Sequence, residues 1–564
     1  MRWGLWLLSV IPFLPVHAQN SARHSVLIHE LLPDPIPSRG LPNAEFIELK
    51  NVSSSDIQLR NWRVSNGSTT GKINTNFILK PDSLVILVSS GSLASFQAFG
   101  SCISLTPFPT LNNEEDTLLL FNEKDSLIHA IAYNSSWYRN PIKKEGGWSL
   151  EMIDASQPCL QSMNWMASTS PFGGTPGKPN LTAGSIRDST MPWIGRAYLA
   201  DSLNLYIQMN EPMYDEVVSL TPQIDITLQQ WLPPLFQVLQ VRLRQPFPKD
   251  SLLTLRLKDL TDCSGNTSAP LSTTIGRFAR QVNTQCIVNE ILFDPPAGGS
   301  DYIEIYNRST EPINVAQLML ANRTINGLLS AARPIITSPF PLLPNQYLLL
   351  TEDSSWIHRY YSPGQILMLQ TALPSFPDDE GTVVILNTQG SVVDELHYTP
   401  DWHHPLMTTP QGVSLERINP MGITQQQQNW HSAASSVRYG TPGYQNSQTI
   451  MFPEVDGTLF VPSSSIISPD QDGYQDFVLF HYQLDQPGYL AKIEVYTMTG
   501  ARVVTIANNE LCGTRGEFRW DGGNTQHMPV PQGNYLVSAK FVHPGGQTKQ
   551  AKIPLAVWQG QLTK

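Results

Sequence analysis

One stretch of this sequence occurs twice. The first copy is IHELLPDPIPSRGLPNAEFIELKNVS at residues 28–53, and the second is VNEILFDPPAGGSDYIEIYNRS at residues 288–309. The two copies lie roughly 260 residues apart, which is far longer than the period of a repeat solenoid. The stretch therefore indicates one domain type that is used twice in a modular chain. The matching acidic residues are Glu30 and Glu290, Asp34 and Asp294, and Glu48 and Glu304.

The similarity continues to the end of each copy. Both copies carry a Ser-Leu-Glu triplet, then an Asn-Trp pair, and both close on Gly-Thr-Pro-Gly. These motifs lie at 149–151 and 414–416, at 164–165 and 429–430, and at 174–177 and 440–443. We therefore predict two equivalent domains, at residues 19–182 and 283–446, each of the usual size for a single domain.

The repeats have the patterns of β-strands. Ile47 and Leu49 alternate with Phe46 and Glu48, which is the period-two pattern of a strand with two different faces. Short apolar runs end in polar turns, and no long helical period is present. These patterns predict an all-β chain, and its 564 residues suggest about four domains.

Two further segments also predict strands. In residues 183–281, Val241 and Leu243 alternate with Arg242 and Arg244, which is typical of half-buried antiparallel strands. We therefore predict one domain at residues 183–281 and another at residues 459–558. Residues 447–458 are expected to form a linker.

The repeated unit resembles the lamin tail domain, and in particular the version found on secreted proteins of Bacteroidota. The resemblance rests on the N/H-E-[IL]-L-x-D-P motif, the E/D-[FY]-I-E-[IL]-x-N strand and the closing G-T-P-G. It implies a fold class of tandem Ig-like β-sandwich domains. It does not imply a nuclear filament, because no coiled-coil heptads precede the repeat.

The other two domains resemble further Ig-like families. N-E-P-M at 210–213 and L-x-D-C-S-G-N at 260–266 are similar to a bacterial Ig-like domain of the S-layer type. In residues 459–558, the V-Y-x-x-x-G strand at 495–500, the W-D-G turn at 520–522 and the G-x-Y strand at 533–535 resemble the Ig-like domain of flagellar hook-capping proteins. The opening of this segment, S-P-D-Q-D-G-x-x-D at 468–476, is similar to the gliding-motility-associated C-terminal domain. The resemblance implies type IX export, with the secretion machinery as a partner.

The N-terminus predicts export as well. Arg2, the apolar run at 5–15 and the small-residue end at Ala18 together have the features of a cleaved signal peptide, residues 1–18. The apolar run is too short to span a bilayer, which takes about 20 residues. We therefore expect a protein that is secreted, extracellular or on the outer cell surface, and not an integral membrane protein. The net charge of −11 argues against a nucleic-acid partner, because phosphates require clustered Lys and Arg.

Five cysteines are compatible with disulfides in an exported chain. Cys102 with Cys159 could connect parts of the first repeat, and Cys263 with Cys286 could connect the second domain to the third. Cys512 would then remain unpaired. The sequence alone does not fix the connectivity, and the absence of a C-x-x-C motif argues against zinc.

One loop is a candidate calcium site. Asp470, Asp472, Tyr474 and Asp476 surround Gly473, and oxygen ligands at alternating positions around a glycine turn suit Ca²⁺. The loop lacks the distal Glu of an EF-hand. The alternative interpretation is an Asx-turn that leads into the next strand. Calcium is the only cofactor that the sequence suggests.

The recurring acidic residues have two interpretations. They could form carboxylate pairs for acid–base chemistry, or they could accept turn and strand hydrogen bonds. No His, Ser or Cys of a nucleophilic site recurs with them, so the structural interpretation is favoured. On a strand, the adjacent His403 and His404 would point to opposite faces and would rarely share one metal ion; a loop is the favoured interpretation. Trp137, Tyr138 and Trp402 are either core residues or exposed platforms for sugars.

Three functional hypotheses follow from these features. The first is a non-enzymatic protein of the cell surface or medium that acts in adhesion, scaffolding or a surface layer. The second is a glycan- or protein-binding accessory module of a secreted enzyme system, which requires exposed aromatics on one face. The third is a hydrolase with a carboxylate site between domains, which requires a pocket with two convergent carboxylates.

Overall fold

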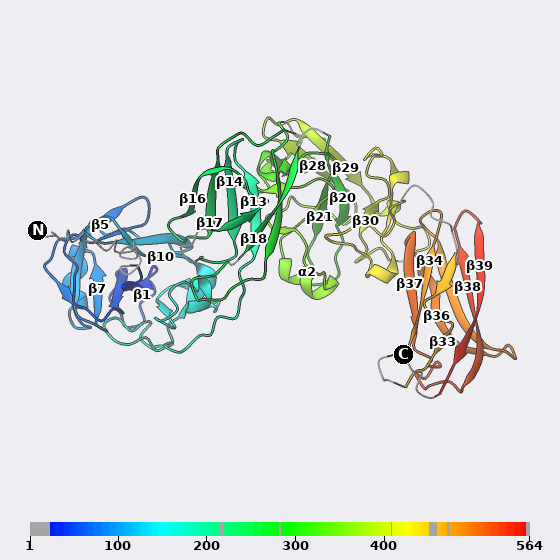
Figure 1. Ribbon diagram of the computed structural model, residues 1–564, viewed down its shortest axis with the longest axis horizontal. Coiled ribbons are helices and arrows are strands. Elements are labelled where there is room, and N and C mark those ends of the chain that lie inside the picture. The colour runs from blue at the N-terminus through cyan, green and yellow to red at the C-terminus, as the bar shows by residue number, and fades with distance from the viewer. Residues whose placement is uncertain are drawn as a thin grey trace, which may run out of the picture. The chain divides into compact units, whose positions relative to one another are not determined.

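The computed structural model describes residues 23–213, 218–249, 251–258, 260–280, 284–407, 409–450, 459–470 and 474–559. Strands form most of the regular structure in these residues, as the all-β class predicts (Figure 1). The chain divides into two compact units, residues 1–246 with 253–275 and residues 247–252 with 276–564. The predicted signal peptide, most of the predicted linker and residues 471–473 lie outside the described residues. No helix of the described residues is long and apolar enough to cross a membrane.

The first repeat is a β-sandwich whose strands join into one bent sheet in the order β10-β9-β4-β5-β8-β7-β2-β1-β11-β12. Its strands are β1 (Val26–Leu32), β2 (Phe46–Asn51), β4 (Arg63–Ser65), β5 (Thr70–Ile73), β7 (Leu84–Val88), β8 (Cys102–Thr106), β9 (Glu115–Phe121), β10 (Leu127–Asn134), β11 (Leu150–Met152) and β12 (Trp165–Ala167), with the small pair β3 (Ile57–Gln58) and β6 (Ile78–Leu79). The neighbours β2, β1 and β11 lie in the middle of one layer, and they position the site described below.

The predicted faces of β2 are confirmed, but both faces are buried. Ile47 and Leu49 belong to the main core of the sandwich. Phe46, on the other face, packs with Phe96 of helix α1 (Leu93–Phe96) in a smaller core. The alternation of residues predicts two faces correctly, but it does not show that a helix and a loop cover the second one.

The second repeat has the same architecture in two separate sheets. One has the order β27-β26-β21-β20-β30-β31 and the other has the order β24-β23-β28-β29. The bounds are β20 (Cys286–Leu292), β21 (Tyr302–Asn307), β23 (Leu318–Ala321), β24 (Arg333–Pro334), β26 (Tyr347–Thr351), β27 (Met368–Gln370), β28 (Gly381–Asn387), β29 (Val392–Tyr398), β30 (Leu415–Arg417) and β31 (Trp430–Ser432), with the small pair β22 (Ile313–Asn314) and β25 (Pro341–Leu342).

Each repeat contains a short helix between two parallel strands, which the sequence patterns do not predict. In the first repeat α1 connects β7 to β8, and in the second α2 (Ser354–Tyr361) connects β26 to β27. Trp356 and Ile357 of α2 pack on Tyr302 of β21. A helix of two turns shows too little periodicity to be recognised among strands.

Residues 183–281 form two sheets, with strand orders β13-β14-β17-β16 and β15-β18-β19. The predicted alternation is confirmed, since Val241 and Leu243 are buried while Arg242 and Arg244 are exposed. The bounds are β13 (Ile194–Leu199), β14 (Asn204–Met209), β15 (Ser219–Thr221), β16 (Ile226–Leu232), β17 (Val238–Leu243), β18 (Leu252–Lys258) and β19 (Leu271–Gly276).

Residues 459–559 form a second Ig-like sandwich, with strand orders β32-β34-β37 and β33-β39-β38-β35-β36. Aromatic side chains fill its core, and the ring of Phe460 stacks on that of Phe480 at 5.2 Å. The bounds are β32 (Phe460–Pro462), β33 (Ile466–Ile467), β34 (Val478–Gln483), β35 (Leu490–Thr497), β36 (Arg502–Leu511), β37 (Arg515–Trp520), β38 (Gly533–Val542) and β39 (Thr548–Val557).

Candidate functional sites: two buried carboxylate clusters

Three glutamates lie side by side on neighbouring strands in each repeat. In the first repeat, Glu30 on β1 is paired across the sheet with Glu48 on one side and Glu151 on the other. The second repeat has the same pairing. We name Glu30, Glu48 and Glu151 cluster 1, and Glu290, Glu304 and Glu416 cluster 2. All six residues are 0% exposed, so each cluster requires hydrogen-bond donors or bound protons.

The Gly-Thr-Pro-Gly motif at 174–177 is the closing loop of cluster 1. The backbone N–H of Thr175 donates to Glu30 at 2.8 Å, and the backbone N–H of Gly177 donates to Glu48 at 2.5 Å. The φ angle of Gly177 is +75°, a left-handed conformation that glycine adopts without strain. The motif therefore presents two backbone donors to two strands of the sheet.

The motif at 440–443 closes cluster 2 in the same way. The N–H of Thr441 donates to Glu290 at 2.9 Å, and the N–H of Gly443 donates to Glu304 at 2.5 Å. Gly443 also has a positive φ angle, +94°. The recurrence of the motif in the sequence thus reports a recurring set of backbone hydrogen bonds.

Side-chain donors satisfy further carboxylate oxygens. Two of these donors, Ser149 and Ser414, lie more than 100 residues from the glutamate in sequence, so the sequence does not pair them. In cluster 1, Ser149 donates to Glu30 at 2.6 Å and Thr182 donates to Glu151 at 2.9 Å; in cluster 2, Ser414 and Tyr302 donate to Glu290, Asn289 donates to Glu304, and Ser447 donates to Glu416.

The two clusters differ at a β-bulge. Each repeat has a bulge just before its first glutamate, and the bulged residue is His29 in one copy and Asn289 in the other. His29 Nδ1 lies 3.2 Å from Glu48. Burial lowers the pKa of His29 to about 4. The contact with Glu48 is therefore a hydrogen bond between neutral groups and not an ion pair.

The hydrogen-bond geometry requires bound protons. Thr441 Oγ1 lies 3.0 Å from a Glu290 oxygen and 2.8 Å from a Glu416 oxygen. The hydroxyl carries one proton and can donate to only one of them. At the other contact a protonated carboxyl must donate to the hydroxyl oxygen. In cluster 1, Thr175 Oγ1 lies 2.9 Å from a Glu151 oxygen but 3.4 Å from a Glu30 oxygen, so the second contact there is long for a hydrogen bond.

The pKa directions agree with this proton count. Burial, assisted by neighbouring carboxylates, raises the pKa of Glu48 and of Glu416 to about 8. Burial also raises the pKa of Glu290, and holds the pKa values of Glu30 and Glu304 well above their usual range. Several of these carboxyls therefore retain a proton at neutral pH.

Glu48→Gln is expected to weaken the loss of first-repeat stability at alkaline pH. The folded pKa of Glu48, about 8, is above the ordinary value of 4.5. Its contribution to stability is therefore complete below pH 4.5 and is lost as the pH rises through 8. Gln is a neutral isostere of the protonated acid and does not titrate. The pH dependence of stability is measured by hydrogen exchange of the β2 amides between pH 6 and 9. The exchange rates are corrected for the intrinsic rate at each pH.

The exposed Glu115 on β9 offers a matched control for this experiment. Glu115→Gln makes the same chemical change outside the cluster and is expected to leave the pH profile unchanged. A Glu48→Gln profile as steep as that of the unmodified chain would show that Glu48 is already ionised in the folded protein.

The contacts of both clusters favour a structural role over acid–base catalysis. An acid–base site needs a substrate within hydrogen-bond reach of its carboxylates, whereas these side chains are closed off by the loops that bond to them. Asp34 accepts the N–H of Ile36, and the N–H of Gly147 donates to the Asp34 carbonyl, as expected for turn formation. The described contacts therefore show that the recurring acids accept turn and strand hydrogen bonds, as the structural interpretation predicts.

The repetition of Gly-Thr-Pro-Gly in the sequence was the one signal that could have identified the closing loops. Nothing in the sequence shows which residues these loops contact.

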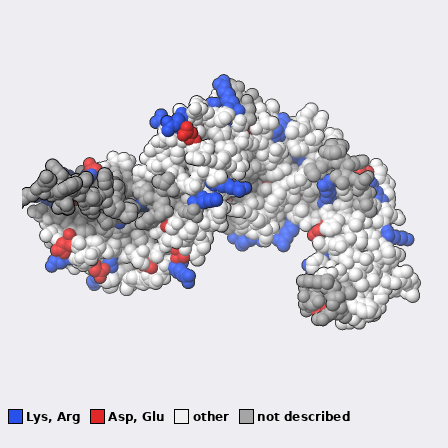
Figure 2. Space-filling view, viewed as in Figure 1, with Lys and Arg blue, Asp and Glu red and all other residues white. Residues whose placement is uncertain are grey.

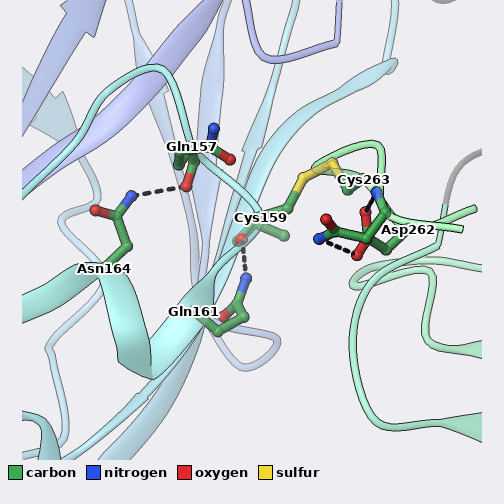
Figure 3. Close-up of a disulfide and its surroundings, with 8 residues drawn as sticks. Gln157, Cys159, Gln161, Asn164, Asp262 and Cys263 are labelled. Carbon is green, nitrogen blue, oxygen red and sulfur yellow. Dashed lines mark hydrogen bonds between the residues drawn. A yellow bond between two sulfur atoms is a disulfide. The ribbon is translucent and has the colours of Figure 1, made fainter. Parts of the chain in front are cut away.

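The disulfide pairing differs from the expected one. Cys159 is bonded to Cys263, with Cα atoms 6.0 Å apart, and Cys102, Cys286 and Cys512 are free (Figure 3). The expected pairs fail for a physical reason. Cys102 packs beside α1, and Cys286 is a 0% exposed core residue at the start of β20.

Three of the five cysteines are expected to react with a thiol reagent in denaturant without reductant, and all five after reduction. A non-reduced digest should contain one linked pair of peptides that carry Cys159 and Cys263. The alternative pairing of Cys102 with Cys159 and Cys263 with Cys286 would leave a single reactive thiol. Burial raises the pKa of Cys102 to about 11 and of Cys512 to about 12, so these thiols react slowly in the folded chain.

The other candidate residues are placed as follows. Asp472 of the candidate calcium loop lies outside the described residues, so calcium at Asp470, Asp472, Tyr474 and Asp476 stays a prediction. His403 and His404 are buried; His403 Nδ1 lies 2.9 Å from Ser432 Oγ.

The three aromatic candidates are part of the cores. Trp137 and Tyr138 are 4% and 3% exposed, which leaves no ring face open for a sugar. Trp402 packs against the core of the second repeat and lies 6.5 Å from Trp430. The core interpretation of these residues is confirmed.

Comparisons with known proteins match one part of the chain. A model of the family described as Lamin Tail Domain matches residues 19–135. Among curated proteins, none matches the sequence. The matched segment covers β1, β2 and β10 of the first repeat but ends before the closing loop.

Solved structures resemble the chain only weakly. CopC from Methylosinus trichosporium OB3b has 17% identity and a TM-score of 0.14, with 19% of this chain and 98% of that chain covered. Dimeric latent PorU from Porphyromonas gingivalis has 7% identity and a TM-score of 0.16, with 78% and 40% covered. Domains 1–6 of the surface layer protein SbsC have 10% identity and a TM-score of 0.15, with 66% and 55% covered. The chain thus spans about half of the last two proteins or less. At these scores the likeness carries no argument, and the chain is an all-β protein of tandem Ig-like domains whose residues 19–135 match the lamin tail domain family.

Proposed function

We propose that this protein is a non-enzymatic, modular component of the cell surface or the surrounding medium, exported by its terminal segments and acting in adhesion or scaffolding. The observation that carries the proposal is the closure of both carboxylate clusters. Each repeat encloses the three carboxyl groups of its cluster in hydrogen bonds from backbone N–H groups and from side chains. The groups most suited to catalysis are thereby used to hold the domain together.

The hydrolase alternative finds little support in the described depressions. The depression beside the disulfide has a volume of about 10 Å³, which is room for one water. A depression of about 500 Å³ on the second repeat includes Asp379, Glu380 and His397. Both carboxylates belong to consecutive residues of one exposed turn, Asp379 and Glu380, and not to separate elements that converge on the depression.

The glycan-binding alternative requires exposed aromatics on one face. The exposed aromatic side chains of the described residues are instead spread over all four predicted domains: Phe172, Trp193, Tyr444, Phe477 and Trp558. On the face shown in Figure 2, Lys and Arg side chains are also scattered rather than clustered.

The experiment that tests the proposal is localisation in cells of the native host, with and without residues 459–564. Surface exposure of the full chain, measured by protease accessibility on intact cells, supports the proposal. Retention of the truncated chain in the periplasm would identify the last domain as the sorting signal. Unchanged surface delivery of the truncated chain would remove type IX sorting from the proposal, and a cytoplasmic full chain would overturn the proposal.

One observation favours protein binding through the second repeat as a second candidate function. The hairpin between β23 and β24 exposes Ile325 (102%) and Leu328 (69%). The equivalent hairpin of the first repeat, between β4 and β5, has the polar residues Asn66 to Thr69 instead. Changing both Ile325 and Leu328 to Ser should reduce attachment of cells to their partner surface without lowering stability. Unchanged attachment would exclude this hairpin as the binding surface.

A further inference from the structure

Three carboxylates converge within residues 183–281, away from both glutamate clusters. Asp188 precedes β13, Glu211 follows β14, and Asp262 lies in the loop after β18. One carboxylate oxygen of each residue lies within 4.8 Å of the others. Ligand oxygens bind Ca²⁺ at about 2.3–2.6 Å, so oxygens on opposite sides of one ion lie roughly 5 Å apart. The spacing of the three oxygens fits a single ion.

Backbone hydrogen bonds hold the three segments together. Asn210 and Trp193 exchange two hydrogen bonds, which join the segment before β13 to the N-E-P-M turn. The N–H of Cys263 donates to the carbonyl of Pro212, and Met213 forms a bridge with Asp262. The two motifs of the S-layer-type resemblance, at 210–213 and 260–266, therefore meet at the carboxylates.

Asp188 has an oxygen that the protein does not use. Its Oδ1 accepts the N–H of Thr190 at 3.0 Å, while Oδ2 is buried and has no hydrogen-bond partner among the described residues. The residue is only 8% exposed. A buried carboxylate oxygen without a donor is costly, and a cation beside it would remove that cost.

The other two carboxylates are oriented by neighbouring groups. Both oxygens of Asp262 accept hydrogen bonds from Asn266, from its N–H at 2.8 Å and from its side chain at 2.9 Å. Asp262 is 1% exposed and adjoins the disulfide at Cys263 (Figure 3). Glu211 is partly exposed and accepts one hydrogen bond from Asn210. Because Glu211 is partly exposed, an ion can reach the buried Asp188 and Asp262 from solvent beside it.

No described cation neutralises this charge. Among the ion pairs of the described residues, none includes Asp188, Glu211 or Asp262. Burial, with the negative charges of Asp262 and Asp188, raises the pKa of Glu211 to about 7. The three carboxylates thus repel one another at close range and lack a basic partner.

We propose that Asp188, Glu211 and Asp262 bind a calcium ion. A set of carboxylate oxygens without His or Cys selects a hard cation. Calcium accepts irregular and bidentate carboxylates, whereas magnesium requires a near-ideal octahedron and retains most of its waters. The ion would join the segment before β13 to the two motif loops beside the disulfide.

The test uses the full chain, freed of metal with a chelator and dialysed. Hydrogen exchange of peptides that cover 186–213 and 260–268 is measured with and without calcium chloride at about 5 mM, a concentration above the dissociation constants of roughly 10⁻⁴–10⁻³ M that are typical of extracellular calcium modules. We expect calcium to slow exchange in both segments at least tenfold. Because the candidate loop at 470–476 lies in other peptides, binding there does not affect this measurement.

Asp188→Asn and Glu211→Gln are expected to remove the calcium-dependent slowing, while the rates without calcium stay close to those of the unmodified chain. Asp225→Asn is the matched control, since Asp225 is an exposed residue of the same domain outside the cluster. It should retain the full response. An unchanged response in both cluster variants would overturn the proposal, as would no response in the unmodified chain. Equal slowing by magnesium at the same concentration would overturn the assignment to calcium.

Discussion

Glu290→Ala is expected to lower the free energy of unfolding of the second repeat by about 3–5 kcal/mol, the range for breaking a buried network of charged or strongly polar groups. Glu290 accepts hydrogen bonds from Tyr302 at 2.6 Å, Ser414 at 2.5 Å and the N–H of Thr441 at 2.9 Å. Alanine leaves these donors buried without an acceptor. The closing loop at 440–443 should then detach.

Hydrogen exchange of β20 and β21 amides measures this free energy locally, which matters in a chain of several domains. Glu290→Gln is the conservative comparison, because Gln retains the acceptor oxygen and mimics a protonated carboxyl. It should cost at most about 1–2 kcal/mol, the value of one perturbed hydrogen bond. An alanine variant as stable as the glutamine variant would show that the network contributes little to stability.

Gly177→Ala is expected to destabilise the first repeat by about 3 kcal/mol or more, through backbone strain and overpacking together. At φ = +75° an L side chain is strained, and a Cβ atom would overlap the carbonyl oxygen of Phe99. A shift of the Gly177 backbone away from Phe99 would disturb the hydrogen bond from Gly177 to Glu48. Exchange of β2 amides measures the loss.

Gly67 provides the matched control for this substitution. Its φ angle is +82°, close to that of Gly177, but a Cβ atom there would meet nothing within 4 Å. Gly67→Ala should therefore cost only the left-handed strain, about 1–2 kcal/mol. The difference between the two variants isolates the contact between the closing loop and Phe99. Equal costs would mean that the loop can shift away from Phe99 without loss of stability.

The buried carboxylates distinguish these domains from an ordinary β-sandwich. A sheet face usually packs against apolar side chains, whereas here part of one face holds three carboxyls under a loop of backbone donors. Such networks fix one arrangement of the chain, because every member needs its own partner. The closing loop follows the first two strands of its cluster by more than 100 residues, so the domain is complete only after almost the whole repeat is present.

The sequence by itself determined the strand content, the repeat and which residues of a strand lie on the same face. Local patterns carry this information: Ile47 and Leu49 alternate with Phe46 and Glu48, and Val241 and Leu243 alternate with Arg242 and Arg244, because strands have a period of two. The recurrence of Glu30 at Glu290 and of Gly-Thr-Pro-Gly at both ends also identified the residues of the clusters. The absence of a recurring nucleophile beside them favoured a structural role over catalysis.

Only the tertiary structure decided what these residues contact. The donors of Thr175 and Gly177 meet Glu30 and Glu48 from more than 100 residues away, and spacing in sequence does not predict such contacts. The same limitation explains the wrong cysteine pairs, since the bond from Cys159 to Cys263 depends on how two domains meet. The carboxylates of Asp188, Glu211 and Asp262 converge for the same reason: three segments, each unremarkable alone, are brought together by the fold.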